Sequence, residues 1–233
     1  MAVGALGRLK ASFAASIGDV VFGMEDGAVS IFGLVFGMAN AAETSADVLL
    51  AGATGAAAAA VSMMAGVWLD ARSERDRDRA LSRRYAELVS TDPGRCEAEI
   101  ATRLQASGMT EAGARGVVAA ANEQEGSLAA MAVALRGGGE GAAARSPAAH
   151  AVWMFVADLF AGAVPVLPFS FLPIDEARWV SIAITAILLV ALGIGRSLVS
   201  ERSAVEAIAE TVGVASAAAV AGLLIAQLIN RAL

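Results

Sequence analysis

Five apolar segments, each long enough to cross a lipid bilayer, constrain what this chain can fold into more than any other feature. They cover approximately residues 17–41, 48–69, 149–172, 179–198 and 207–230. About 20 apolar residues span the hydrocarbon core as an α-helix, and a helix satisfies its own backbone hydrogen bonds in lipid. With 57% hydrophobic and only 17% charged residues, the composition is that of a membrane protein. The sequence therefore predicts an all-α membrane protein with five transmembrane helices.

The stretch between the second and third spans is polar and predicts a helical insert outside the membrane. Residues 70–84 mix acids and arginines densely, which is typical of a solvated helix face. After a turn at residues 91–93, two further helices are expected over 95–107 and 110–135. Residues 136–147 are rich in Gly and Ala and predict a linker.

These shifts in composition divide the chain into three parts. Residues 1–70 hold an amphipathic lead-in helix over residues 1–16 and the first two spans. Residues 71–147 hold the insert and its linker, and residues 148–233 hold the last three spans.

The basic residues predict how the chain is oriented in the membrane. Arg8, Lys10, eleven arginines between residues 72 and 145, Arg196 and Arg202 fall on one side of a five-span arrangement. Only Arg178 and Arg231 fall on the other side. The positive-inside rule then places the N-terminus and the insert in the cytoplasm. We expect an integral protein of the bacterial inner (cell) membrane, with the lipid bilayer and not nucleic acid as its surroundings.

The first span carries three acids, at Asp19, Glu25 and Asp26. A charge at the centre of a lipid-facing helix costs about 3 kcal/mol on insertion scales, so such residues face a bundle interior or a wet cavity. Small or acidic residues recur every third or fourth position along one helical face, at Asp19, Gly23, Asp26, Ser30, Gly33 and Gly37. This stripe predicts a polar groove that lines an ion path. The Gly-x-x-x-Gly pairs Gly23 with Gly27 and Gly33 with Gly37 also predict close helix packing, and a dimer seam is one candidate place for it.

Two further positions in the spans are candidates for such a path. Met63 stands on a stripe of small residues in the second span, and Asp158 is an acid within the third. Asp158 is open to two interpretations, a residue of the path or a structural partner of another span. Pro165 and Pro168 predict a kink or break in the second half of that helix.

The chain offers little for other chemistries. A single cysteine, Cys96, and a single histidine, His150, exclude cysteine-based zinc sites and multi-histidine metal sites. We find no nucleophile elbow and no phosphate-cradling loop, so an enzyme is not expected. No tightly bound cofactor is expected either.

The order and spacing of these motifs resemble the vacuolar iron transporter (VIT) family. The resemblance rests on DVVFGMEDGAVSIFGLVFGMANA with its Asp-Gly, on VSMMAGVWLDARSERD with its Ser-Met, and on FVADLFAGAVPVLPF with its Pro-Val-Leu-Pro. It implies a homodimer that exports Fe²⁺ or Mn²⁺ from the cytoplasm in exchange for protons. By the same resemblance Asp26 binds metal and proton in turn, and Met63 is the soft ligand. A thioether disfavours Mg²⁺ and Ca²⁺ relative to softer transition metals.

The chain also departs from the family pattern. The family's insert holds a row of glutamates that bind metal. Here Ala134, three residues after Met131, stands where the family has a glutamate. Cys96 and Glu99 stand where a pair of glutamates three residues apart is usual. Glu99, Met131 and Cys96 are the residues left for a metal site in the insert. Glu25 and Asp158 are additional acids that could serve as metal or proton ligands. A membrane scaffold or metal sensor that kept the fold without transport is therefore the alternative function.

Overall fold

The computed structural model describes residues 7, 10–14, 16–124, 126–136, 147–200 and 202–232. The chain divides into two compact units, one of Met1–Trp68 with Ala148–Leu233 and the other of Leu69–Pro147. Helices account for the regular structure of both units, and the described residues contain no strand. The predicted lead-in over residues 1–16 and the predicted linker over 136–147 lie largely outside the described residues.

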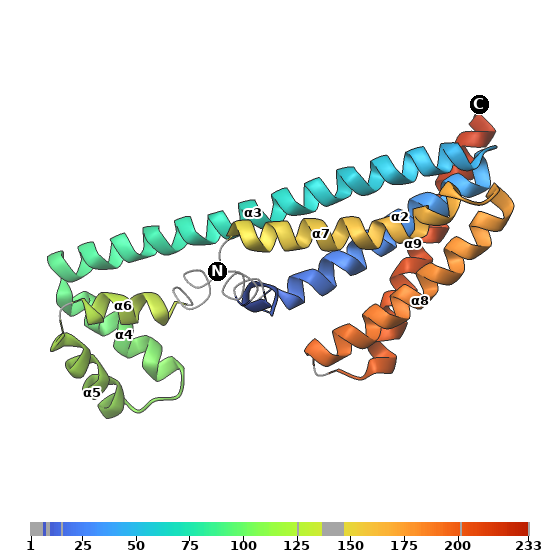
Figure 1. Ribbon diagram of the computed structural model, residues 1–233. Helices are drawn as coiled ribbons and strands as arrows, with labels where there is room; N and C mark the ends of the chain where they lie inside the picture. The colour runs from blue at the N-terminus through green and yellow to red at the C-terminus, as the bar shows by residue number, and fades with distance from the viewer. Residues whose placement is uncertain are drawn as a thin grey trace. The chain divides into compact units, whose positions relative to one another are not determined.

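The first unit contains five helices that are long and apolar enough to cross a membrane (Figure 1). They are α2 (Ile17–Ala41), α3 (Ser45–Thr91), α7 (Pro147–Val166) with the short 3₁₀ helix η1 (Leu167–Ser170), α8 (Ile174–Ser200) and α9 (Ala204–Ala232). The predicted all-α class and the five spans are confirmed. The second span and the charged helix that follows it form one continuous helix of 47 residues, α3.

The second half of α2 packs directly on α9 through small residues. A Cβ atom added to Gly222 of α9 would lie 2.1 Å from the carbonyl oxygen of Gly33, and one added to Gly37 would lie 2.6 Å from the carbonyl oxygen of Gly222. Because no side chain separates the helices here, their backbones touch. This is the close approach that small residues allow between helices in lipid.

The first half of α2 packs in the same way on α7. A Cβ atom added to Gly27 would lie 2.3 Å from the carbonyl oxygen of Asp158, and one added to Gly23 would lie 2.5 Å from the sulfur of Met154. All four glycines of the predicted Gly-x-x-x-Gly pairs are therefore used within one chain. The predicted close packing is found within the chain, on α7 and α9, and the dimer seam remains a prediction.

Pro165 lies inside α7 and ends its regular course. The helix gives way to η1 after Val166, which agrees with the predicted break. The Ser181 hydroxyl of α8 donates a 2.7 Å hydrogen bond to the Pro165 carbonyl. Proline cannot donate a backbone hydrogen bond and disturbs the preceding turn, so α8 satisfies a carbonyl group at the break.

The second unit has an apolar core of its own. The end of α3 meets α4 (Pro93–Ala106), α5 (Glu111–Asn122) and α6 (Ser127–Ala134) around this core. Its buried members include Tyr85, Cys96, Ile100, Leu104, Val118 and Leu128. Asp92 caps α4 by accepting a hydrogen bond from the Arg95 backbone, which agrees with the predicted turn before it.

The single helix predicted over residues 110–135 is wrong, because the structure contains two helices there. Thr110 caps the first, α5, by accepting a hydrogen bond from the Gly113 backbone. Gly126 then adopts a left-handed conformation with φ of 81° immediately before α6. Glycine takes this conformation at little steric cost, so it lets α6 turn back onto the core.

Candidate functional site on helix α2

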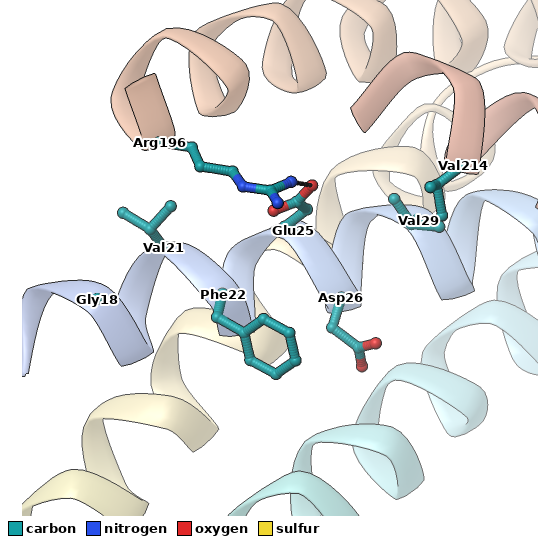
Figure 2. A pocket seen from close by; sticks show the side chains of 8 residues that line it. All are labelled: Gly18, Val21, Phe22, Glu25, Asp26, Val29, Arg196 and Val214. Atoms are coloured by element: carbon teal, nitrogen blue, oxygen red, sulfur yellow. Dashed lines mark hydrogen bonds and ion pairs between the residues drawn. The ribbon is translucent and has the colours of Figure 1, made fainter. Parts of the chain in front are cut away.

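A cavity of about 310 Å³ lies alongside α2 in the first unit (Figure 2). Residues of α2, α8 and α9 line it, namely Gly18, Val21, Phe22, Glu25, Asp26, Val29, Arg196 and Val214. Two acids of the first span, Glu25 and Asp26, thus share one cavity whose other α2 residues are apolar or glycine.

Glu25 is held by both neighbouring helices. Its Oε1 atom lies 3.1 Å from Arg196 Nη1 of α8 and accepts a 2.7 Å hydrogen bond from the Thr211 hydroxyl of α9. Its side chain is only 17% exposed. The guanidinium compensates the charge of Glu25, so this acid has a counter-ion within the chain.

The surroundings of the Asp26 side chain differ from those of Glu25. Its side chain is half-buried and points away from Glu25 and Arg196 (Figure 2). In the part of the chain that the structure describes, its carboxylate takes part in no hydrogen bond and no ion pair. Adjacent residues of a helix project about 100° apart, which accounts for the different surroundings of these two acids.

Asp158 of α7 is a second acid in the interior of this unit. It is 1% exposed, and neither of its carboxylate oxygens is hydrogen-bonded within the described residues. Its backbone and Oδ1 lie against Gly27 of α2, the residue that follows Asp26. The structure therefore brings Asp26 and Asp158 near each other from α2 and α7.

The two methionines of interest lie on different helices. Met63 is half-buried on α3 and is absent from the residues that line the cavity. Met154 of α7 is 3% exposed and packs against Gly23, one turn before Asp158. Sequence reasoning missed Met154, although its four-residue spacing from Asp158 places both on one helical face.

The stripe predicted as a single groove on α2 faces different neighbours along its length. Asp19 pairs with His150 of α7, Gly23 faces α7, and Gly33 and Gly37 face α9. Ser30 is exposed. The stripe is therefore not one continuous groove, because α7 covers the first half of α2 and α9 covers the second.

In the insert, Glu99 is engaged by a cation of the chain. Its Oε1 atom pairs with the Arg136 guanidinium, accepts a 2.7 Å hydrogen bond from the Tyr85 hydroxyl, and lies 3.7 Å from Arg103 Nε. The hydrogen bonds from Arg136 and then Tyr85 lower the pKa of Glu99 to about 2. Glu99 is thus an ionised carboxylate whose counter-ion is an arginine.

The other two candidates of the insert belong to its apolar core. Cys96 is fully buried, and burial raises the pKa of its thiol. Met131 packs against the same core. Among the described residues, no three His, Cys, Asp or Glu side chains come together as a metal-binding group.

Comparison with known proteins covers both units. A family model described as the VIT family matches residues 17–227, from the first span to near the end of the last. No curated protein was found to match the chain.

Proposed function

The chain belongs to the VIT family, which indicates membrane metal-ion transport in general, and we propose that it is a secondary transporter of a divalent transition metal. It exports Fe²⁺ or Mn²⁺ from the cytoplasm in exchange for protons. The metal is the transported substrate, and no resident cofactor takes part.

The observation that carries this proposal is the contrast between Glu25 and Asp26. The Arg196 guanidinium compensates Glu25, whereas Asp26 lines the same cavity and has no partner among the residues that the structure describes. An uncompensated carboxylate within a membrane span is costly, and either a proton or a cation removes that cost. Because the two compete for the same oxygens, binding one releases the other, and this competition couples metal movement to proton movement.

Asp158 supplies a second carboxylate beside Asp26. A buried, ionised carboxylate without a hydrogen-bond partner is strongly disfavoured, so Asp158 holds a proton whenever no cation is near. Two carboxylates from α2 and α7 neutralise one divalent cation. This pairing supports a role for Asp158 in the path over the purely structural interpretation.

A thioether gives the site its preference for transition metals. Met63, which is half-buried on α3, is the sulfur ligand that membership of the family favours. Sulfur favours softer ions over Mg²⁺ and Ca²⁺. Replacing Met63 by Leu keeps the volume, so it reduces metal selectivity more than stability.

The arginine asymmetry supports a cytoplasmic N-terminus and insert in a bacterial inner membrane. The protein acts as a homodimer.

Flux of Mn²⁺ into proteoliposomes, measured with and without a proton gradient, tests the proposal. The Asp26→Asn variant keeps the shape of the side chain and removes its charge, so proton-dependent flux is lost while the protein remains folded. Glu43→Gln is the matched control, since it removes an exposed acid from the loop after α2 and keeps wild-type flux. Wild-type flux in Asp26→Asn would contradict the proposal.

A scaffold or sensor function is the second candidate. The observation that favours it lies in the insert, where the carboxylate of Glu99 binds Arg136 instead of being open to metal. The same flux assay separates the two functions, because a scaffold gives no proton-dependent flux in the wild-type protein.

A further inference from the structure

The ion pair at Glu25 is one part of a longer chain of charges. Arg196 Nη1 lies 3.1 Å from Glu25, while its Nη2 lies 3.3 Å from Glu210 Oε2 of α9. Glu210 also lies 3.3 Å from Arg202 Nη1, in the segment between α8 and α9. One guanidinium therefore bridges two carboxylates, one at the cavity and the other nearer to solvent.

The two carboxylates differ in how firmly they are placed. Glu25 is 17% exposed and is also held by Thr211, whereas Glu210 is 48% exposed. A guanidinium has several donors in a planar fork. Arg196 can therefore leave Glu25 while it keeps Glu210, and its charge never loses a partner during that movement.

We propose that Arg196 is a positioning residue that acts as a tethered cation in competition with the transported ion. It holds Glu25 while the cavity is empty and passes to Glu210 when a divalent cation enters, so that Glu25 becomes a ligand beside Asp26. This inference rests on the proposed transport function and adds a control on the availability of Glu25.

Charge balance gives the physical reason. Asp26 and Glu25 are the two acids among the residues that line the cavity. While Asp158 still holds its proton, a divalent cation at Asp26 keeps one positive charge uncompensated, and it repels Arg196, which lines the same cavity. Both the uncompensated charge and the repulsion are removed when Glu25 releases the guanidinium and binds the metal. Figure 2 shows the two carboxylates directed to opposite sides, as expected while Arg196 holds Glu25.

Binding of Mn²⁺ to the purified full-length protein tests the inference through two substitutions with opposite effects. Arg196→Gln frees Glu25, so the dissociation constant falls on the order of tenfold, as expected when one more carboxylate becomes available to the ion. Glu210→Gln takes away the second partner of Arg196, so the guanidinium stays on Glu25 and the dissociation constant rises. Arg115→Gln, which breaks an exposed ion pair with Glu111 in the insert, is the control and leaves binding unchanged.

A double substitution shows whether Arg196 acts through Glu25. In a Glu25→Gln background, Arg196→Gln changes the dissociation constant less than about twofold, because the ligand that it would release is gone. If the full gain persists without Glu25, Arg196 acts only through its general field and the inference is overturned.

A purely structural role for Arg196 gives a different pattern. Arg196→Gln and Glu210→Gln would then lower thermal stability and leave Mn²⁺ affinity unchanged or shifted in the same direction, which overturns the inference. Asp26→Asn separates this failure from that of the proposed function. If Asp26→Asn loses Mn²⁺ binding, the proposed transport site stands even where the inference about Arg196 fails. If Asp26→Asn binds Mn²⁺ as the wild type does, the proposed transport site itself is refuted.

Discussion

The Tyr85 hydroxyl donates a 2.7 Å hydrogen bond to Glu99 and accepts one of 2.6 Å from Arg136 Nε. The three residues come from α3, α4 and the segment that follows α6. The Arg136 guanidinium also lies over the Tyr85 ring, 5.6 Å from its centroid. One carboxylate, one hydroxyl and one guanidinium thus join three segments of the insert at the edge of its core.

The insert should lose stability in acid through Glu99. The pKa of the Glu99 carboxyl is about 2 in the folded protein, whereas its ordinary value is 4.5. Because the folded pKa is the lower one, the stabilisation is complete above about pH 4.5 and is lost as the pH falls toward 2. Glu99 is 26% exposed, so after allowance for solvent screening we expect a loss on the order of 1 to 2 kcal/mol.

Pepsin cleavage within the insert measures this loss. Cleavage of the wild-type protein should increase between pH 4.5 and 2 relative to the Glu99→Gln variant, which has no such group to titrate. Taking the ratio of the two proteins at each pH removes the pH dependence of pepsin itself. A ratio that does not change over this range would contradict the assigned role of Glu99.

A methyl group at Gly222 should separate α2 from α9. The added carbon would lie 2.1 Å from the Gly33 carbonyl oxygen, so the backbones must move apart. We expect Gly222→Ala to lose about 2 kcal/mol or more, within the range of overpacking. Gly213→Ala on the same helix is the control, because nothing lies within 4 Å of its added carbon. Melting temperatures in detergent should fall for the first variant and hold or rise for the second.

The insert should bind divalent metal weakly. Glu99 is already paired with Arg136, and Cys96 lies in the apolar core. In the full-length Asp26→Asn protein, residual metal binding reports on the insert, because the site at Asp26 is disabled. Calorimetry with Mn²⁺ should detect no stoichiometric micromolar site. Detection of such a site would show that the remaining acids of the insert form a metal cluster.

Cysteine labelling should reveal the orientation of the chain in the membrane. With the insert in the cytoplasm, an impermeant reagent added to intact cells reaches Ser45→Cys at the start of α3 and Ala232→Cys at the end of α9. It does not reach Ser107→Cys, which follows α4 in the insert. The native Cys96 is buried and adds no background. Labelling of Ser107→Cys in intact cells would reverse the predicted topology.

The five spans were predictable because their signal is local. Each span is a long apolar run, Pro165 marks a break through its backbone, and Asp92 marks a cap through its side-chain carboxylate. The partners of Glu25 were not predictable in this way, because Arg196 and Thr211 lie far along the chain and reach it only through the packing of α8 and α9.

The glycines of α2 illustrate the same limit. Their spacing correctly indicated close packing, but it does not identify the helix against which each glycine packs. The two turns of Gly23 and Gly27 contact α7, and those of Gly33 and Gly37 contact α9. Met154 was missed for a related reason, since a methionine in an apolar span has the same pattern whether it fills space or faces an acid.

The glycine contacts in both halves of α2 also determine how this helix moves. Backbone held against α7 near Gly27 and against α9 near Gly37 resists rolling of α2 about its own axis. Asp26 and Glu25 therefore change direction by rotamer changes, which take picoseconds to nanoseconds, while collective helix motions take microseconds to milliseconds. Exchange of binding partners at these two acids is consequently fast. The slow step of a transport cycle is then a rearrangement of the helices around α2.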